Sequence, residues 1–335
     1  MRALVLVEPG HTEVRNIPVP DAEQVGNALV RIETAGICGT DSSIVAGKIP
    51  AELPRVMGHE AVGTVEIGGR PGSIPVGTRV LIDPGISCDV CDLCRRGYPN
   101  ICRNGGLLGR DFDGVFADYV SIDEKQLLVV PDSIDPESSG ILQVLGTCVH
   151  GLSGVTVRAG DTAVVLGLGV AGQLLAQLLT KQGATVIGVA RSEWKRKLAL
   201  DVGIHAAVSP AEVAELAQTL TGGRGPELVV EAVGTEATFT QAIELVGAAG
   251  TVVLYGTATG GTNGLPYYQL YFKELTIRNP RAATKADYQR AIELVASGIV
   301  VGGPIISASF GLSQAEEALA AVKESTTLKV LIDAT

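Results

Sequence analysis

Apolar and polar residues alternate with a period of two along the first eighty residues of the chain. This alternation is typical of strands that bury one face, and turns rich in glycine and proline separate the runs. The strands predicted in this part are Ala3–Val7, Ala28–Ala35, Ala61–Ile67 and Arg79–Ile82. We therefore expect an all-β first domain, built as a compact barrel.

A mixed segment follows, in which Val115–Val120 and Leu127–Val130 are strand-like, Pro131–Gly140 is polar and loop-like, and Ile141–Leu152 is helical. From residue 161 onward, strands alternate with amphipathic helices. The strands are Ala163–Leu166, Thr185–Val189, Ala206–Ser209, Leu228–Ala232 and Thr251–Tyr255, and the clearest helices are Val170–Gln182 and Glu193–Val202. This order predicts a parallel sheet with helices on both faces.

The last fifty residues return to a mixed pattern. An amphipathic helix over Ala286–Ser297 precedes a strand over Ile305–Phe310, a helix over Ser313–Lys323 and a final strand over Lys329–Ile332. The sequence Ser-Gln-Ala-Glu at residues 313–316 resembles a capping box, which is a structural feature. We expect this tail to join the first domain.

Length and composition allow two globular domains. The chain has 335 residues, of which 46% are hydrophobic and 19% charged, and its net charge of −10 is spread without long runs. Nothing in this distribution recruits nucleic acid or an anionic membrane. The apolar start, Met1–Val7, is too short for a secretory signal, and no apolar run reaches the roughly 18 residues that span a bilayer. We expect a cytoplasmic protein.

Four of the six cysteines lie within fifteen residues, at Cys88, Cys91, Cys94 and Cys102. Two disulfides are the alternative, but the compartment and the Cys-x-x-Cys spacing favour reduced thiols. Four thiolates at these spacings can close a tetrahedral zinc site and hold a lobe too small to have its own core. With four protein ligands the site has no open position, so its role is structural.

A second candidate metal site combines His59 and Glu60 with Cys38 upstream. A neutral imidazole is a good ligand for zinc, and the neighbouring carboxylate can bind the metal or orient other ligands. Cys38 could instead be a buried small side chain, as most free cysteines are. The segments around Cys38, around His59 and Glu60, and around the four clustered cysteines together favour Cys38 as a zinc ligand.

A glycine-rich turn follows the strand-like run of residues 162–166 and opens an apolar helix. Glycines there allow a tight turn and close approach of a pyrophosphate to the helix N-terminus, whereas an ordinary turn between strand and helix is the alternative. The predicted coenzyme-binding residues of this turn are Gly167, Gly169, Val170, Ala171 and Gly172.

The second strand of the parallel sheet ends at Arg191 and Ser192, where a dinucleotide-binding chain often carries an acidic residue. A guanidinium and a hydroxyl suit the 2′-phosphate of NADP better than the free ribose of NAD. Alternatively, Arg191 stacks on adenine in an enzyme that accepts both coenzymes. We expect NADP rather than NAD.

These motifs, in their order and separation, resemble those of the zinc-containing medium-chain dehydrogenase/reductases, the alcohol, sorbitol and threonine dehydrogenase group. The resemblance covers essentially the whole chain. It implies a GroES-like β-barrel catalytic domain over residues 1–150 and 286–335, with a zinc lobe at 88–102. It also implies a Rossmann coenzyme-binding domain over 151–285, a doubly wound parallel sheet, and a cleft between the two domains. Catalytic zinc would be bound by Cys38 and His59, with Glu60 as ligand or near neighbour.

The chain departs from this family at the third ligand, where Gln143 stands in place of Cys, Asp or Glu. An amide oxygen would bind zinc weakly and leave the metal more positive; Cys148 is the competing candidate. Thr40 matches the family hydroxyl that passes the alcohol proton outward. The histidine often found three residues later is Ser43 here, so the proton path could run through water or the coenzyme ribose.

The resemblance implies hydride transfer between a secondary alcohol, of the polyol, sugar or cyclitol class, and a nicotinamide coenzyme. Its members are usually homodimers or homotetramers. Two alternatives remain at this point. One is a reductase of activated double bonds without catalytic zinc, and the other is a non-enzymatic NADP(H)-binding sensor.

Overall fold

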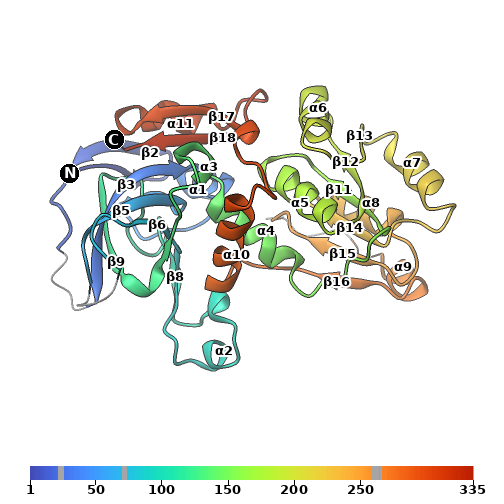
Figure 1. Ribbon diagram of the computed structural model, residues 1–335, viewed down its shortest axis with the longest axis horizontal. Helices are drawn as coiled ribbons and strands as arrows, with labels where there is room; N and C mark the ends of the chain where they lie inside the picture. Colours follow the sequence, from blue (N-terminus) through green and yellow to red (C-terminus); the bar gives the residue numbers. More distant parts are fainter. Residues whose placement is uncertain (22–25, 70–73, 258–263, 265, 335) are drawn as a thin grey trace. The chain divides into compact units, whose positions relative to one another are not determined.

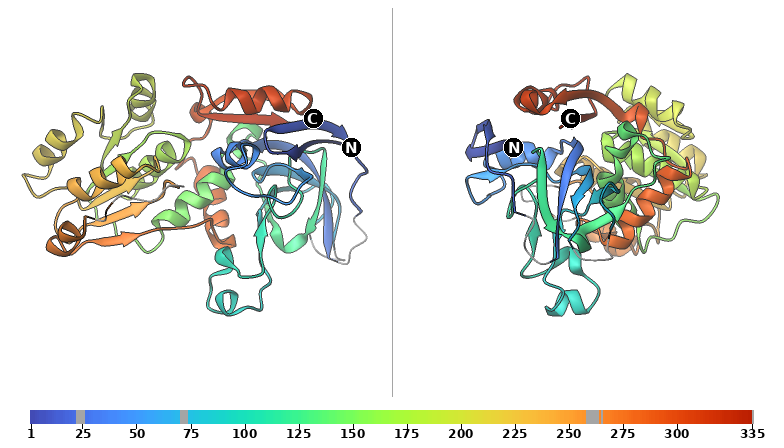
Figure 2. Two further views of the ribbon diagram at one scale, coloured as in Figure 1. Left: turned by 180° about the vertical axis from the view of Figure 1, so that it is seen from behind. Right: turned by 60° about the vertical axis from the view of Figure 1, so that its left-hand side comes forward.

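The computed structural model describes residues 1–21, 26–69, 74–257, 264 and 266–334. The chain divides into two compact units (Figures 1 and 2). Unit 1 contains Met1–Gly146 and Ala282–Thr335, and unit 2 contains Thr147–Arg281. Within the described segments, none of the helices combines the length and the apolar character needed to cross a membrane.

Unit 1 is built on β-sheets whose strands are mostly antiparallel. A seven-stranded sheet has the order β10-β6-β5-β3-β18-β17, with β9 also paired to β3, and a three-stranded sheet has the order β2-β1-β4. Their bounds are β1 Arg2–Glu8, β2 His11–Asn16, β3 Asn27–Gly36, β4 Arg55–Val56, β5 Ala61–Ile67, β6 Arg79–Ile82, β9 Tyr119–Asp123, β10 Leu127–Val129, β17 Ile306–Gly311 and β18 Lys329–Asp333. The four strands predicted in the first eighty residues are confirmed, whereas β2 and the short β4 were not foreseen.

The tail of the chain completes this unit, as the sequence predicts. The last strand, β18, pairs antiparallel with β3 and parallel with β17. Helix α10 (Lys285–Ala296) and helix α11 (Ala315–Ala321) belong to the same unit. The predicted capping box at Ser313 is wrong, because Leu312–Gln314 forms a 3₁₀ turn and the helix begins only at Ala315, without a side-chain cap.

Two other expectations in unit 1 need correction. The strand expected at Val115–Val120 is β9, which starts at Tyr119, because the residues before it bond instead to residues 56–58 and to β1. The segment expected as a loop, Pro131–Gly140, contains a short helix, α3 (Pro136–Ser139). Its N-cap is Asp135 and proline is its first residue, which is common helix-start chemistry.

Unit 2 is a six-stranded parallel sheet with the order β13-β12-β11-β14-β15-β16. Its strands are β11 Thr162–Leu166, β12 Thr185–Val189, β13 Ala206–Val208, β14 Leu228–Glu231, β15 Thr251–Leu254 and β16 Thr276–Arg278. Every residue of β11 is buried, so both faces of the sheet are covered there. Five strands were expected, and the edge strand β16 was missed.

The helices of unit 2 follow its strands in alternation. They are α5 Val170–Lys181, α6 Glu193–Asp201, α7 Val213–Leu220, α8 Glu236–Leu245 and α9 Tyr267–Phe272. An earlier helix, α4 (Leu142–Leu152), crosses the division between the units. The strand order, with β11 central and the chain running outward to either edge, is that of a doubly wound Rossmann sheet.

Candidate metal centres and coenzyme site

Cys38 is the N-cap of a helix that the sequence analysis did not foresee, α1 (Gly39–Val45). The backbone N–H of Thr40 donates to Cys38 Sγ at 3.5 Å, and the backbone N–H of Cys38 donates to Asp41 Oδ2 at 2.8 Å. The N-cap position fixes the Cys38 side chain at the start of α1, with its sulfur beside the amide of Thr40. The role of Cys38 as a metal ligand stays a prediction.

His59 and Glu60 come from the short loop between β4 and β5. Gly58 precedes them with φ +94°, and a Cβ at this position would lie 2.4 Å from the ring of Phe116. Only glycine tolerates both conditions. One donor atom from each of Cys38, His59 and Glu60 lies within 4.8 Å of the others, so the structure brings these three predicted residues together.

Asp41 contacts the Nδ1 atom of the His59 imidazole, and the sequence did not predict this contact. His59 Nδ1 lies 3.1 Å from Asp41 Oδ1, and both side chains are buried. In the described chain, neither atom has a partner in good hydrogen-bond geometry. A proton on Nδ1, shared with this carboxylate, would leave Nε2 for a metal, and carboxylate–histidine–metal arrangements of this kind are common. The signal in the sequence was the Cys-x-x-Asp spacing at a helix start.

The electrostatics of this cluster favour a cation. Burial alone would disfavour a charged His59, yet the negative charges of Asp41 and Cys38 outweigh burial and raise the histidine pKa well above its usual value. The same field would attract a divalent metal. Thiolate, imidazole and carboxylate donors are those that zinc takes in proteins, so the residues present fit the metal.

Glu60 has a buried partner that the sequence did not reveal. Its Oε2 forms an ion pair with Lys329 Nζ on β18, and Lys329 also donates to the carbonyl of Ile37 at 3.2 Å. Gly36 leaves room for this contact, because a Cβ there would lie 2.5 Å from Lys329 Cε. Lys329 therefore balances the negative charge of Glu60 within the group of Cys38, His59 and Glu60, the candidate metal-ligating group.

Gln143, predicted as third ligand, is buried in the first turn of α4. Its Nε2 donates to the hydroxyl of Tyr288 at 3.2 Å. The competing candidate, Cys148, belongs to unit 2, where its Sγ lies 3.7 Å from the carbonyl of Ala171 and 3.6 Å from Tyr255 Oη. The third-ligand role of Gln143 stays a prediction.

Thr40 is half-buried beside Cys38 in the first turn of α1, and Ser43 donates to the carbonyl of Gly39 at 3.1 Å inside the same helix. Ser43 is thus engaged locally. The part of Thr40 in a proton path stays a prediction.

The four-cysteine lobe lies between β7 (Gly85–Ile86) and β8 (Gly106–Leu107) and contains the short helix α2 (Asp92–Arg95). The four sulfurs lie within 4.8 Å of one another, with Cys91 and Cys94 at 3.5 Å and Cys88 and Cys102 at 3.4 Å. All are free thiols, so disulfides are not formed.

The thiols of this lobe are held in unequal environments. The pKa of Cys91 is lowered by hydrogen bonds from the backbone amides of Cys94 and Arg103, whereas burial raises the pKa of Cys94. Four converging sulfurs without another role are the donor set of a structural zinc site.

Each glycine of the predicted coenzyme turn has a geometric reason. Gly167 has φ +98°, and a Cβ there would lie 2.6 Å from Val233 Cγ2. A Cβ on Gly172 would lie 1.8 Å from the carbonyl oxygen of Gly167. Gly169 is the N-cap of α5 and has open space around it, so a phosphate can approach the backbone of Val170 and Ala171 at the helix start.

Arg191 and Ser192 follow β12, beside that turn in the sheet. Arg191 is exposed, and its carbonyl accepts a hydrogen bond from Arg196 Nη1 at 2.8 Å. Ser192 is the N-cap of α6, but its side chain makes no capping hydrogen bond. Burial, and then the positive charge of Arg191, lower the pKa of Lys195 on the neighbouring helix.

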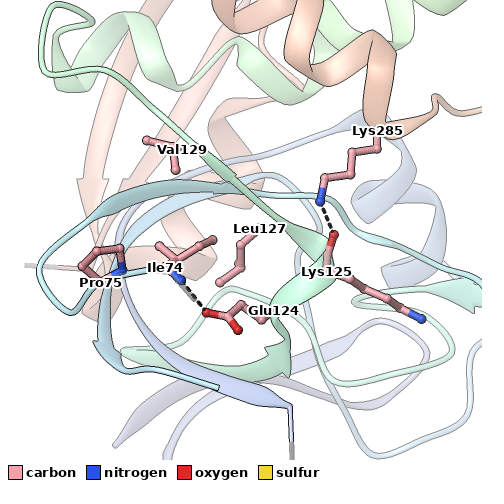
Figure 3. A pocket seen from close by; sticks show the side chains of 7 residues that line it. All are labelled: Ile74, Pro75, Glu124, Lys125, Leu127, Val129 and Lys285. Atoms are coloured by element: carbon pink, nitrogen blue, oxygen red, sulfur yellow. Dashed lines mark hydrogen bonds between the residues drawn. The ribbon is translucent and has the colours of Figure 1, made fainter. Parts of the chain in front are cut away.

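A separate pocket of about 560 Å³ in unit 1 contains none of these residues (Figure 3). Its polar groups bond one another: Lys285 Nζ donates to the carbonyl of Lys125, and Glu124 accepts from the backbone of Ile74. Its wall is completed by Pro75, Leu127 and Val129.

The comparisons with known proteins agree with this geometry. Residues 24–132 match the family model of the alcohol dehydrogenase GroES-like domain, and residues 170–297 match that of the zinc-binding dehydrogenases. A solved structure from Sinorhizobium meliloti, described as a zinc-binding dehydrogenase bound to NADP, is 33% identical, covers 99% of this chain and 98% of its own, and superposes with a TM-score of 0.93. The chain belongs to the zinc-type medium-chain alcohol dehydrogenase family.

Relatives within this family are similar over nearly their full length. The sorbitol dehydrogenase of Halalkalibacterium halodurans is 29% identical, with 99% of both chains covered. D-xylulose reductase A of Aspergillus oryzae is also 29% identical, with 94% of this chain and 91% of the relative covered. This zinc-type dehydrogenase is therefore an oxidoreductase that uses zinc and a nicotinamide coenzyme.

Proposed function

We propose that the chain is a zinc-dependent, NADP-preferring dehydrogenase of a secondary alcohol within a polyol, sugar or cyclitol. The relatives named for sorbitol and D-xylulose support this substrate class. The observation that carries the proposal is the convergence of half-buried Cys38 with buried His59 and Glu60 in one group. A double-bond reductase without catalytic zinc has no use for that group.

Cys38 and His59 would hold the catalytic zinc, with Gln143 as third ligand and Glu60 as ligand or near neighbour. Zinc bound there supplies a Lewis acid, which lowers the pKa of a substrate hydroxyl as it lowers that of water to about 7. Lys329 neutralises Glu60, and Gln143 is itself neutral, so Cys38 is the main uncompensated negative ligand. This donor set leaves more positive charge for polarising the substrate than a set with an acidic third ligand.

Thr40 would accept and pass on the proton of the alcohol. Its position next to Cys38, at the start of α1, supports this role. Because Ser43 is bonded within the helix, the onward path would use water or the coenzyme ribose. The hydride would go to the nicotinamide ring, which needs no covalent intermediate with the protein.

The coenzyme would place its pyrophosphate on the turn from Gly167 to Gly172, at the N-terminus of α5. Arg191 and Ser192 would bind the 2′-phosphate of NADP. The exposed guanidinium, the uncommitted hydroxyl and the basic neighbour Lys195 support this preference.

The chain would work as a homodimer or homotetramer in a reducing compartment such as the cytoplasm. Four aromatic side chains of the short helix α9 are each more than 70% exposed: Tyr267, Tyr268, Tyr271 and Phe272. Exposed apolar clusters of this kind indicate a contact surface between proteins. The lobe supports the compartment, because zinc requires its thiolates to be reduced.

The test follows nicotinamide absorbance with zinc-loaded protein and a panel of polyols, cyclitols and simple secondary alcohols, using NADP and NAD in turn. We expect turnover with a polyol-class substrate and NADP, and its loss in Cys38→Ser. Turnover of activated double bonds that survives Cys38→Ser would support the zinc-independent reductase instead. Tight NADPH binding without any turnover would support a sensor.

A further inference from the structure

Tyr288 of helix α10 is one of the largest side chains buried in unit 1, with 2% of its surface exposed. Its ring packs in an apolar cluster with Leu142 of α4 and Leu128 of β10. It also lies directly against Gly146, where a Cβ would come within 2.2 Å of Tyr288 Cδ1. Because Gly146 has no side chain, the ring of Tyr288 can pack directly against the first turns of α4.

The hydroxyl of this ring reaches Gln143, one helical turn before Gly146. Gln143 Nε2 donates to Tyr288 Oη at 3.2 Å, and both side chains are buried. A phenylalanine would fill the same apolar cluster without burying a polar atom. Burying a hydroxyl and an amide is costly unless they bond each other, so this pair requires an explanation beyond packing.

Tyr288 stays a neutral phenol in this setting. Burial, together with the negative charges of Asp83, Glu60 and Asp287, raises its pKa well above the usual value. The apolar cluster around Tyr288 also contains Val62 of β5, two residues after Glu60, so the pair packs against the strand that directly follows His59 and Glu60. A neutral hydroxyl can hold an amide but cannot serve as a base.

We propose that Tyr288 is a positioning residue for the catalytic metal centre, whose hydroxyl holds Gln143 by Nε2 and so presents the amide oxygen to the metal. This inference rests on the proposed function, in which Gln143 is the third ligand. The two polar atoms of a planar amide point to different sides, and oxygen is the one that ligates metals. Without the hydroxyl, the amide loses the contact that orients it, and the metal keeps a poorly held ligand.

The test uses cobalt(II) as the metal probe, because its visible spectrum reports the ligands around it. Wild-type protein, Tyr288→Phe, Gln143→Ala and the double variant are loaded with cobalt, and binding and spectra are compared. Tyr119→Phe is the matched control, since it removes a tyrosine hydroxyl elsewhere in unit 1. The cobalt bands that disappear in Cys38→Ser are assigned to the catalytic site.

We expect Tyr288→Phe to weaken cobalt binding at the catalytic site by about 10- to 100-fold and to change its spectrum. Cobalt in the four-cysteine lobe and the control variant should behave as in wild type. In the Gln143→Ala background, Tyr288→Phe should add little, because the hydroxyl acts through the amide. Gly146→Ala, which pushes the ring away while keeping its hydroxyl, should reproduce the spectral change.

An unchanged cobalt affinity and spectrum in Tyr288→Phe would overturn the inference. An equal loss of cobalt affinity from Tyr288→Phe in the wild-type and Gln143→Ala backgrounds would also overturn it, because it would mean general structural damage. These results leave the proposed function intact. A wild-type spectrum that is insensitive to Cys38→Ser would instead overturn the catalytic metal site itself.

Discussion

Lys329 and Glu60 form a buried ion pair although 269 positions separate them in the chain. Lys329 also bonds the carbonyl of Ile37, the residue before Cys38, and so ties the last strand to both segments that supply the proposed ligands of the catalytic zinc. The lysine therefore sets the charge of the metal-ligating group as well as its position.

Replacing Lys329 with methionine should lower the free energy of unfolding by about 3–5 kcal/mol, because it leaves the Glu60 carboxylate buried and unpaired. Urea denaturation of the zinc-loaded protein measures this. Lys125→Met, which breaks the exposed pair with Asp89, is the control and should cost about 1 kcal/mol or less. Adding Glu60→Gln to Lys329→Met should recover most of the loss; no recovery would argue against an electrostatic cause.

Asp83 should make stability depend on pH. Burial raises the pKa of its carboxyl from 3.8 to about 6, so the folded state holds a proton that the unfolded state has released. The free energy of unfolding should therefore fall as pH rises from about 4 to about 6, by on the order of 3 kcal/mol in total. Above about pH 6 the ionisation of Asp83 should lower the free energy of unfolding no further.

Comparison with Asp83→Asn isolates this contribution, because the amide stays neutral and its oxygen can still accept from Gly85, as Asp83 does at 2.9 Å. The stability of wild type relative to the variant should fall between pH 4 and 6. Asp132→Asn, an exposed position, should run parallel to wild type. A constant difference between wild type and Asp83→Asn would contradict the prediction.

The two zinc ions should leave the protein in order when a chelator is added. The proposed catalytic set has one cysteine with weaker or neutral donors, whereas the lobe offers four thiols within 4.8 Å. We expect about two zinc ions per chain, with activity lost during the first release and the lobe unfolding during the second. A chromophoric chelator and far-UV circular dichroism follow both phases, and Cys94→Ser should remove the second.

Arg191→Ala should weaken NADP binding by about 10- to 100-fold, the effect of losing a charge-assisted hydrogen bond worth about 1.5–3 kcal/mol. NAD binding should change little. Coenzyme titration by fluorescence tests this, with Arg224→Ala elsewhere in unit 2 as the control for net charge. An equal loss for both coenzymes would mean that Arg191 stacks on adenine.

Replacing Tyr268 and Tyr271 of α9 with serine should shift the protein toward smaller oligomers. Both side chains are more than 70% exposed, and Tyr268 stacks on Phe272 with ring centres 5.8 Å apart. Light scattering coupled to size exclusion measures the mass at several concentrations. Val76→Ser, which removes an exposed apolar side chain in unit 1, should leave the mass unchanged.

Regular elements were predictable because their signals are local. The periods of two and of about 3.6 located β5, β6 and β12 with their correct ends, and glycine spacing located the coenzyme turn. Helix α1 was missed because it is only seven residues long and its N-cap is a cysteine, which is not a usual capping residue.

The partners around the metal group could not be predicted in the same way. The contacts of Asp41 with His59, of Lys329 with Glu60 and of Tyr288 with Gln143 join residues from different elements. Tertiary packing sets such pairs, and apart from the Cys-x-x-Asp spacing that places Asp41 beside Cys38, no period or motif indicates them. The third ligand was also uncertain because Gln143 departs from the residue types that usually identify it.

The place of β18 between β3 and β17 has a consequence for biosynthesis. Unit 2 is a continuous stretch that can fold while the ribosome is still translating, but unit 1 must wait for the tail that follows it. Until then the Thr34–Gly36 end of β3 lacks its β18 partner, and the carboxylate of Glu60 lacks the ammonium of Lys329. Translation that stops shortly before Lys329 would yield a chain with a complete coenzyme fold and an unfinished metal centre, a substrate for chaperones and proteases.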